Sequence, residues 1–223
     1  MKNLFLLTCL VFFSITSFAQ YGYKDGNRIG ISGGVSQTTL FTSNFKSKPG
    51  IGYGGGLSVR GNYYNNWSMI YGMQFFINNF SLETTATSAP FLKKDTEFSL
   101  SGVQVKLLLS YNVVKDHVSF DFGPVLQING KMKVDSKDEN NIINGTLALK
   151  AKQIEEVGSI NGSAYVGFSA GTKVVRALIF YQYGFTNALN KLNSQEGLPL
   201  LLPNNEKFKG NFGTISGQII FNL

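Results

Sequence analysis

The stretch Val118-Ser-Phe-Asp-Phe-Gly-Pro-Val-Leu-Gln-Ile-Asn129 alternates between two kinds of side chain. Its even positions are apolar, and its odd positions are polar or small apart from one Val. A period of two sustained over this length predicts a β-strand with one apolar face and one polar face. The stretches 67–78 and 213–223 alternate in the same way. Apolar residues interrupt the polar face of these three stretches at Ile70, Phe76, Val125 and Ile220.

The same period divides the chain into eight expected strands. They cover about 27–37, 50–63, 66–80, 97–111, 117–130, 161–173, 175–186 and 209–223. Three connections are short, and four are long and hold most of the Lys, Asn, Ser, Asp and Glu: about 38–49, 81–96, 131–160 and 187–208. Because short and long connections alternate strictly, all long loops should lie at one end of an up-and-down antiparallel sheet. No helix is predicted, although 147–157 has some helical character.

The composition fits a sheet that meets two different solvents. The 223 residues include 25 Gly, 19 Phe and 10 Tyr, yet only 15% are charged, against roughly 25% in a typical soluble domain. Strands of about 11–15 residues can cross a bilayer at a tilt, and closing eight of them pairs every backbone group. We therefore predict an all-β protein: an eight-stranded antiparallel up-and-down transmembrane β-barrel with four long external loops and short periplasmic turns. A secreted β-sandwich is the alternative that alternation leaves open.

The first nineteen residues have the pattern of a Sec signal peptide. A basic start precedes the apolar run 4–15, and Ser17 and Ala19 place small residues before a cleavage site. We expect cleavage between Ala19 and Gln20. The remaining residues, 20–223, would then form an outer-membrane β-barrel domain.

Motifs for catalysis or for cofactors are weak. The only Cys, Cys9, lies in the predicted signal peptide, and the only His, His117, stands beside Asp116 at a short turn. These counts argue against a multi-Cys zinc site or a two-His metal site. Gly50-Ile-Gly-Tyr-Gly-Gly55 resembles a dinucleotide loop, but a strand pattern follows it where a helix is needed. We expect no cofactor, no metal and no enzymatic activity. An outer-membrane enzyme acting on lipid is an alternative, but it would need a Ser/His or His/Asp pair near the long loops.

Four charged residues fall on the face that should point into the barrel. They are Arg28, Arg60, Lys106 and Asp121, and four Gln share their register: Gln74, Gln104, Gln182 and Gln218. Charges removed from water must be paired. We predict a polar network in the lumen, with Asp121 as the main acidic partner of two or more of the cations. A proton or ion path is one interpretation. A structural plug is favoured, because eight strands leave an interior just wide enough for side chains.

The excess positive charge, +7 over the whole sequence, is scattered over the expected long loops. A nucleic-acid site would need a continuous basic stripe with stacking aromatic residues, so no nucleic-acid partner is expected. Phosphates of outer-membrane lipid are the favoured target, because an anionic surface attracts flanking cations. Protein partners could bind through the same loops, and we expect the barrel itself to be a monomer.

Several short motifs together resemble a known family. They are Arg28-Ile-Gly-Ile-Ser-Gly-Gly34, Val103-Gln-Val-Lys-Leu-Leu-Leu-Ser-Tyr111, Asp121-Phe-Gly-Pro124, Gly167-Phe-Ser-Ala-Gly171 and Tyr181-Gln-Tyr-Gly-Phe-Thr-Asn187. Their order is similar to that of the PorT-like outer-membrane β-barrel domain. The resemblance implies a small barrel of the Gram-negative outer membrane, and the family name suggests a link to a protein-secretion assembly by fold-level analogy. The chain departs from the family at Gln182, where an Arg is common, and at its terminal Leu223. We predict a non-enzymatic structural or interaction platform, with an accessory barrel of a secretion assembly as the alternative.

Overall fold

A computed structural model describes residues 27–62, 66–86, 89–115 and 117–223. The predicted signal peptide, 1–19, and the predicted cleavage site between Ala19 and Gln20 lie outside the described residues.

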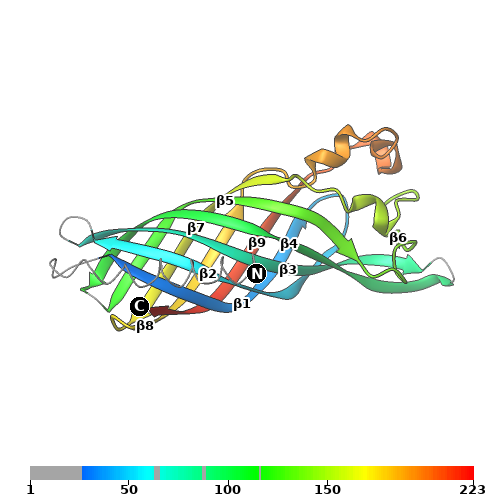
Figure 1. Cartoon of the computed structure of the whole chain (residues 1–223). Coiled ribbons are helices and arrows are strands. Elements are labelled where there is room, and N and C mark those ends of the chain that lie inside the picture. Colours follow the sequence, from blue (N-terminus) through cyan, green and yellow to red (C-terminus); the bar gives the residue numbers. More distant parts are fainter. Residues whose placement is uncertain (1–26, 63–65, 87–88, 116) are drawn as a thin grey trace, which may run out of the picture.

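Eight long strands form one closed antiparallel ring (Figure 1). They are β1 (Arg28–Thr42), β2 (Ser47–Asn62), β3 (Trp67–Ala86), β4 (Ala89–Val114), β5 (Val118–Val134), β7 (Ile160–Gly171), β8 (Val175–Gly184) and β9 (Gly210–Asn222). Each strand pairs with its neighbours in sequence, and the first strand, β1, pairs with the last, β9, which closes the ring. The two-residue strand β6 (Ile142–Ile143) adds to the far end of β3. The predicted all-β, eight-stranded antiparallel barrel is confirmed.

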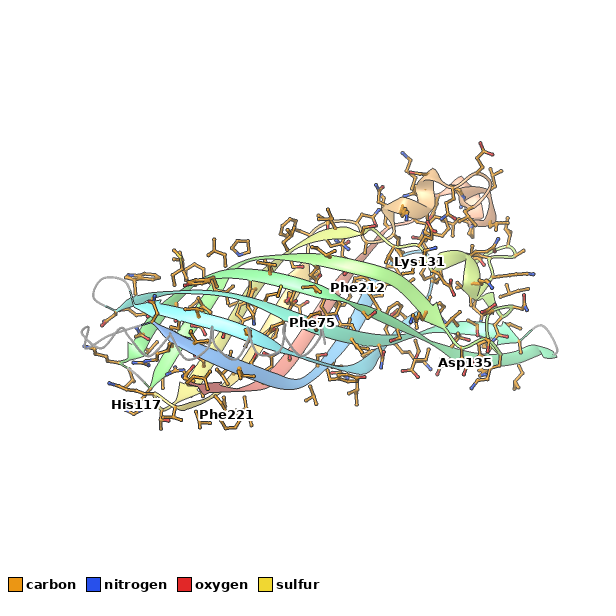
Figure 2. The ribbon with its side chains drawn as sticks, in the orientation of Figure 1. Phe75, His117, Lys131, Asp135, Phe212 and Phe221 are labelled. Atoms are coloured by element: carbon orange, nitrogen blue, oxygen red, sulfur yellow. The ribbon has the colours of Figure 1, made fainter. Side chains whose placement is uncertain are left out.

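Short turns lie at one end of the barrel and the longer connections lie at the other. Figure 2 shows His117 and Phe221 at the short-turn end, and Lys131 and Asp135 at the opposite end. Two of the predicted long loops are shorter than expected, because β1 and β2 extend into 38–49, and β3 and β4 extend through most of 81–96. The inward and outward alternation continues there with Ser, Thr, Lys and Glu on the outside. This polar composition resembles that of a loop although the residues belong to strands.

A β-bulge on β5 explains how a third predicted loop region, 131–160, begins as strand. Asn129 pairs with Gly102 and Met132 pairs with Leu100, so two residues of β5 oppose one residue of β4. The extra residue reverses which side chains face inward. Met132 therefore points into the interior and is fully buried.

The apolar residues that interrupt the polar face point inward. Ile70 and Val125 are 6% and 2% exposed, and they pack with Leu108, Tyr165 and Phe180 in a small cluster inside the barrel. Two of the four interruptions in the sequence pattern, Ile70 and Val125, therefore belong to an apolar layer of the lumen, and Phe76 belongs to the larger core described next.

A second and larger apolar core fills the loop end. Phe80 of β3 is fully buried, with its ring centroid 5.8 Å from that of Phe98 and 5.5 Å from that of Phe212. The connections 135–159 and 185–209 fold back onto this core with buried Leu and Ile side chains, among them Leu149, Ile154, Leu189 and Leu192. Four short 3₁₀ turns shape these connections: Ala151–Ile154, Asn190–Ser194, Pro199–Leu201 and Pro203–Asn205. Within the described residues no helix is long and apolar enough to cross a membrane.

The outer face of the barrel carries a continuous apolar band. On β3 every outward residue from Trp67 to Ile77 is apolar, and on β4 the same holds from Val103 to Val113. Aromatic rings join around the short-turn end: Trp67 with Tyr111, Trp67 with Phe122, Phe122 with Phe120, and Phe120 with Phe168, at centroid distances of 5.0–6.4 Å. Beyond the band, the outward residues of β4 turn polar, with Ser99, Glu97, Asp95 and Lys93.

Candidate functional site in the lumen and at the loop end

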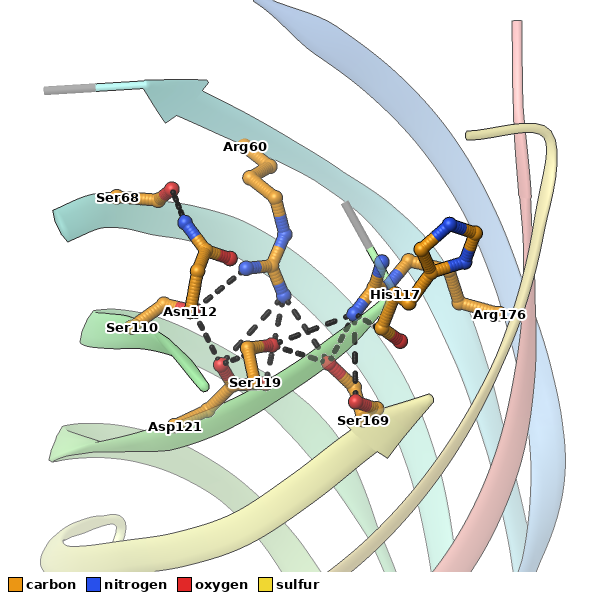
Figure 3. A network of polar contacts seen from close by, with 9 residues as sticks. All are labelled: Arg60, Ser68, Ser110, Asn112, His117, Ser119, Asp121, Ser169 and Arg176. Carbon is orange, nitrogen blue, oxygen red and sulfur yellow. Dashed lines mark hydrogen bonds and ion pairs between the residues drawn. The ribbon is translucent and has the colours of Figure 1, made fainter. Parts of the chain in front are cut away.

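A charged layer crosses the lumen near the short-turn end (Figure 3). Five strands contribute its side chains: Arg60 from β2, Ser110 from β4, Ser119 and Asp121 from β5, Ser169 from β7, and Arg176 from β8. These residues meet because each has the inward register at the same end of its strand.

Asp121 is the acidic centre of this layer and is 1% exposed. Its Oδ1 accepts hydrogen bonds from Ser110 Oγ at 2.5 Å and from Ser119 Oγ at 3.1 Å. Arg60 Nη2 lies 3.4 Å from Asp121 Oδ2, which makes an ion pair. The same guanidinium also donates to Ser110 Oγ at 2.5 Å and to Ser169 Oγ at 3.3 Å. The carboxylate and the guanidinium therefore share a set of hydroxyl groups.

Arg176 is a member of this layer that we did not single out from the sequence. Its Nη2 donates to Ser169 Oγ at 3.2 Å, to Ser119 Oγ at 3.4 Å, and to the carbonyl oxygens of Ser169 and His117, both at 3.3 Å. Arg176 has the same parity as Gln182 on β8, which the sequence analysis did place inward. The alternation alone could have found it.

The other two predicted members, Lys106 and Arg28, line a cavity beside this layer. The Nζ of Lys106 lies 5.7 Å from the ring centroid of Tyr165 and 5.6 Å from that of Phe180, which is cation–π geometry. Arg28, Arg60 and Lys106 all line one cavity of about 20 Å³, which also reaches Asp121. That volume suits a single water molecule.

A layer of glutamines lies further along the lumen. Gln104 Nε2 donates to Gln74 Oε1 at 3.1 Å, and Gln74 Nε2 donates to Gln218 Oε1 at 2.9 Å. Glycines let the neighbouring strands approach closely at this layer, because a Cβ on Gly34 would collide first with the backbone at Gly217 and Gln218, and one on Gly56 with the backbone at Met73 and Gln74. A second cavity, also about 20 Å³, lies beside this layer. The apolar layer of Ile70, Leu108, Val125, Tyr165 and Phe180 lies between the two cavities.

The single histidine of the sequence makes its contact at the edge of the barrel. His117 Nδ1 lies 3.0 Å from the carbonyl oxygen of Gly171 at the short-turn end, away from the loops. Across the described parts of the chain, no group of three or more His, Cys, Asp or Glu could hold a metal ion. The charged layer binds the strands to one another.

The loop end has its own polar junction at Glu156. Its carboxylate pairs with Lys131 Nζ at 3.1 Å and with Lys191 Nζ at 3.0 Å. Hydrogen bonds from Lys191 and then Lys131 hold the pKa of Glu156 below the ordinary value of 4.5. Since Lys131 is on β5 and Lys191 is in the connection 185–209, Glu156 joins three segments of the loop end.

A groove of about 1360 Å³ opens on the outside of the loop end. Its walls are the β1–β2 turn, the ends of β3 and β4, and the segment leading into β9. Phe41 and Tyr183 form part of its lining on the barrel wall, and Lys46 and Lys209 lie among its polar residues. This groove was not anticipated from the sequence, because its walls come from segments far apart in the chain.

Comparison with known proteins finds likeness in three-dimensional structure. No protein-family model matches the chain, and no curated protein sequence matches it. The crystal structure of Neisserial surface protein A has a TM-score of 0.49 and 13% identity, covering 89% of this chain and 99% of its own. The attachment invasion locus protein Ail of Yersinia pestis, solved with the heparin analogue sucrose octasulfate, has a TM-score of 0.47, 13% identity and the same coverage. The outer membrane protein OprG of Pseudomonas aeruginosa has a TM-score of 0.43 and 10% identity, covering 90% of this chain and 95% of its own.

The closed ring of strands and the inward side chains define the class of protein by themselves. The chain is an eight-stranded antiparallel β-barrel with an apolar outer band and polar layers inside. The similar structures have identities of 10–13%, which carry no information on the activity, ligand or partner of this chain.

Proposed function

We propose that this protein is a small, non-enzymatic β-barrel of the bacterial outer membrane that serves as a structural or interaction platform through its external loops. The observation that supports this most is the inversion of the usual arrangement of side chains. Ile51, Phe75 and Ile179 face outward and are 61–73% exposed, whereas Asp121 and Arg176 are buried inside. A soluble barrel would place these two classes the other way round.

The height of the apolar band fits a bilayer. From Val103 to Val113 on β4 there are ten residue steps, or about 34 Å of strand at about 3.4 Å per step. A tilt of about 45° reduces this to about 24 Å across the membrane, close to the roughly 25 Å band of outer-membrane barrels. The polar ends of β3 and β4 then project beyond the band on the loop side.

A substitution on the lipid face of β4 tests this placement. Leu107 lies near the middle of the band and Ser99 lies on the same face beyond it. Leu107→Arg should lower the free energy of unfolding of the barrel in phosphatidylcholine vesicles by about 2–4 kcal/mol, and Ser99→Arg should lower it by at most about 1 kcal/mol. Folding is followed by urea titration and by the heat-modifiable mobility of the barrel on gels. Equal losses for the two variants would contradict a membrane-spanning band.

The lumen supports a plug in preference to a pore. Two cavities inside it are about 20 Å³ each, and packed layers of apolar residues and Gln lie along its length. Partners would therefore meet the loops, which have a core of their own and present a fixed surface. In planar bilayers the purified protein should show no steady ion conductance. A stable open channel would contradict the plug.

An accessory role in a protein-secretion assembly is the second candidate. Besides the PorT-like sequence motifs, two loop residues favour it: Leu147 and Leu200 are 69% and 62% exposed. Their segments are joined by the hydrogen bond from the Leu147 amide to the Leu201 carbonyl oxygen, at 2.8 Å. Two exposed apolar side chains on joined loops suit a protein partner. Purification from native membranes in mild detergent would separate the candidates, since an accessory barrel should come out with stoichiometric partners.

Export through the Sec pathway is part of the same proposal. Its test is the mass of the mature protein, which should begin at Gln20. A lipid-acting enzyme receives no support from His117, which lies at the end opposite the loops.

A further inference from the structure

We infer that the groove at the loop end binds the phosphorylated headgroup of an outer-leaflet glycolipid, with Lys46 and Lys209 contacting the phosphate. This inference rests on the proposed membrane placement and names a ligand class and a site for it. Neither the sequence motifs nor the fold identifies this site.

The groove begins where the apolar wall of the barrel ends. Phe41 on β1 and Tyr183 on β8 are outward residues, 49% and 41% exposed, and their ring centroids lie 6.2 Å apart. Below them on the same wall are Tyr181 and Ile215, which belong to the apolar band. Aromatic residues of this kind mark the boundary between hydrocarbon and headgroups. A lipid whose acyl chains lie against the band would thus place its headgroup in the groove.

Two cations of the groove are available to an anion. Within the described residues, Lys48 pairs with Asp95 at 2.6 Å and Lys93 pairs with Glu83 at 3.2 Å. Lys46 and Lys209 are exposed, and no ion pair within 4 Å joins either to a carboxylate of the described chain. Lys46 acts on Glu83 only at longer range, as one of the charges that lower the pKa of that carboxyl.

The backbones that carry these two lysines are fixed in place. The carbonyl oxygen of Lys46 accepts a hydrogen bond from the Glu83 amide at 3.1 Å. The Lys209 amide donates to Asn44 Oδ1 at 2.9 Å, and Asn44 Nδ2 donates to the Lys207 carbonyl oxygen at 3.2 Å. Asn44 is buried and lies two residues before Lys46. One side chain therefore holds the β1–β2 turn against the segment that enters β9, so that both lysines belong to one site.

The balance of charge favours an anion, although the lining is mixed. Lys46, Lys48, Lys93 and Lys209 line the groove, together with two carboxylates, Glu83 and Glu206. A phosphate monoester presents up to two negative charges and several acceptor oxygens to the unpaired ammonium groups. The rings of Phe41 and Tyr183 supply an apolar contact that a free phosphate could not use. These features together select a membrane-bound glycolipid over a soluble phosphorylated sugar.

The test compares two charge-matched double variants. Purified, refolded barrels in detergent are titrated with lipid A as the phosphorylated glycolipid, and bound lipid is counted by native mass spectrometry. We expect Lys46→Gln with Lys209→Gln to bind lipid A about 10- to 30-fold more weakly, since each surface cation contributes about a factor of five. The control, Lys133→Gln with Lys150→Gln, removes two exposed lysines that do not line the groove and should bind like the parent.

Two further arms identify the source of the phosphate. Tyr183→Ala should weaken lipid A binding, and soluble glucosamine 1-phosphate should bind far more weakly than lipid A. Equal binding by the two double variants would overturn the site, and equal binding of the soluble sugar phosphate would overturn the lipid assignment. The heat-modifiable mobility of every variant is measured in vesicles alongside. A barrel that inserts normally but fails the lipid test refutes this site alone, whereas a barrel that does not insert refutes the proposed function.

Discussion

Replacing Asp121 by Leu should destabilise the barrel strongly, because it removes the carboxylate at the centre of the charged layer. The carboxylate is 1% exposed and accepts hydrogen bonds from Ser110 and Ser119 in addition to the ion pair with Arg60. Removing one partner of a buried pair typically costs about 3–5 kcal/mol, since the other charge stays behind uncompensated. Arg60 retains the hydroxyls of Ser110 and Ser169 as acceptors, so we expect a loss near the lower limit, about 3 kcal/mol.

The double variant Arg60→Met with Asp121→Leu separates charge from packing. It removes both members of the ion pair, so no unpaired charge remains from it in the lumen. We expect it to recover most of the stability lost in Asp121→Leu, because replacing a whole buried pair by apolar residues is often neutral. The coupling between the two sites would then be about 2 kcal/mol, within the range for contacting residues.

Folding into vesicles is measured by reversible urea titration. Trp67 is the only tryptophan, and it stands in the aromatic row at the short-turn end, so its fluorescence reports insertion. A loss of about 3 kcal/mol changes the folding equilibrium by about 10²-fold. The reasoning is refuted if Asp121→Leu unfolds at the same urea concentration as the parent, or if the double variant is as unstable as the single one.

Three other predictions concern the core, the loop junction and the glycines. Phe80→Ala should cost about 3–5 kcal/mol in the loop-end core and expose the loops to protease while the barrel stays heat-modifiable, whereas the outward Phe75→Ala should leave loop protection unchanged. Because the pKa of Glu156 is lowered by its lysine partners, its contribution is present at neutral pH and is lost as the pH falls through that lowered value. The extra amide exchange of Glu156→Gln around residues 189–195 should therefore be seen at pH 7 and shrink as the pH falls below 4.5, and a difference that does not shrink in acid would count against the junction. Gly34→Val should prevent closure of the β1–β9 seam, whereas Gly33→Val, whose Cβ meets nothing within 4 Å, should fold; normal mobility of both on gels would show that the close approach is unnecessary.

Alternation along the chain was sufficient to predict the barrel and most of its inward residues. It placed Arg60, Asp121 and the glutamines correctly because parity fixes the face of a strand regardless of what lies around it. It did not identify the loop-end core, because that core is completed by the connections 135–159 and 185–209, whose packing against Phe80, Phe98 and Phe212 follows no period of two. The bulge on β5 was also missed, since a reversal of parity looks like the end of a strand.

Contacts between residues of different strands were harder to predict than the face of the sheet to which each side chain points. Lys106 has the inward register, but its ammonium lies over the rings of Tyr165 and Phe180. That position depends on the stagger between strands, which a single sequence does not report. The groove at the loop end was missed for the same reason, because Asn44 and Lys209 are brought together by the pairing of β1 with β9.

The polar layers of the lumen have a role in selecting the fold that an apolar filling could not perform. Ile70, Leu108 and Val125 would have nearly the same free energy facing lipid as facing inward. Their layer therefore does little to distinguish one strand register from another. A shift of one residue on β5, however, would turn Asp121 toward lipid, and the same shift on β2 would do so for Arg60. A charge at the lipid face costs about 2–4 kcal/mol at the bilayer midplane and less toward the interface, and the three strands that carry Arg60, Asp121 and Arg176 would each contribute a penalty. The charged layer therefore favours one register of the strands that carry its charges.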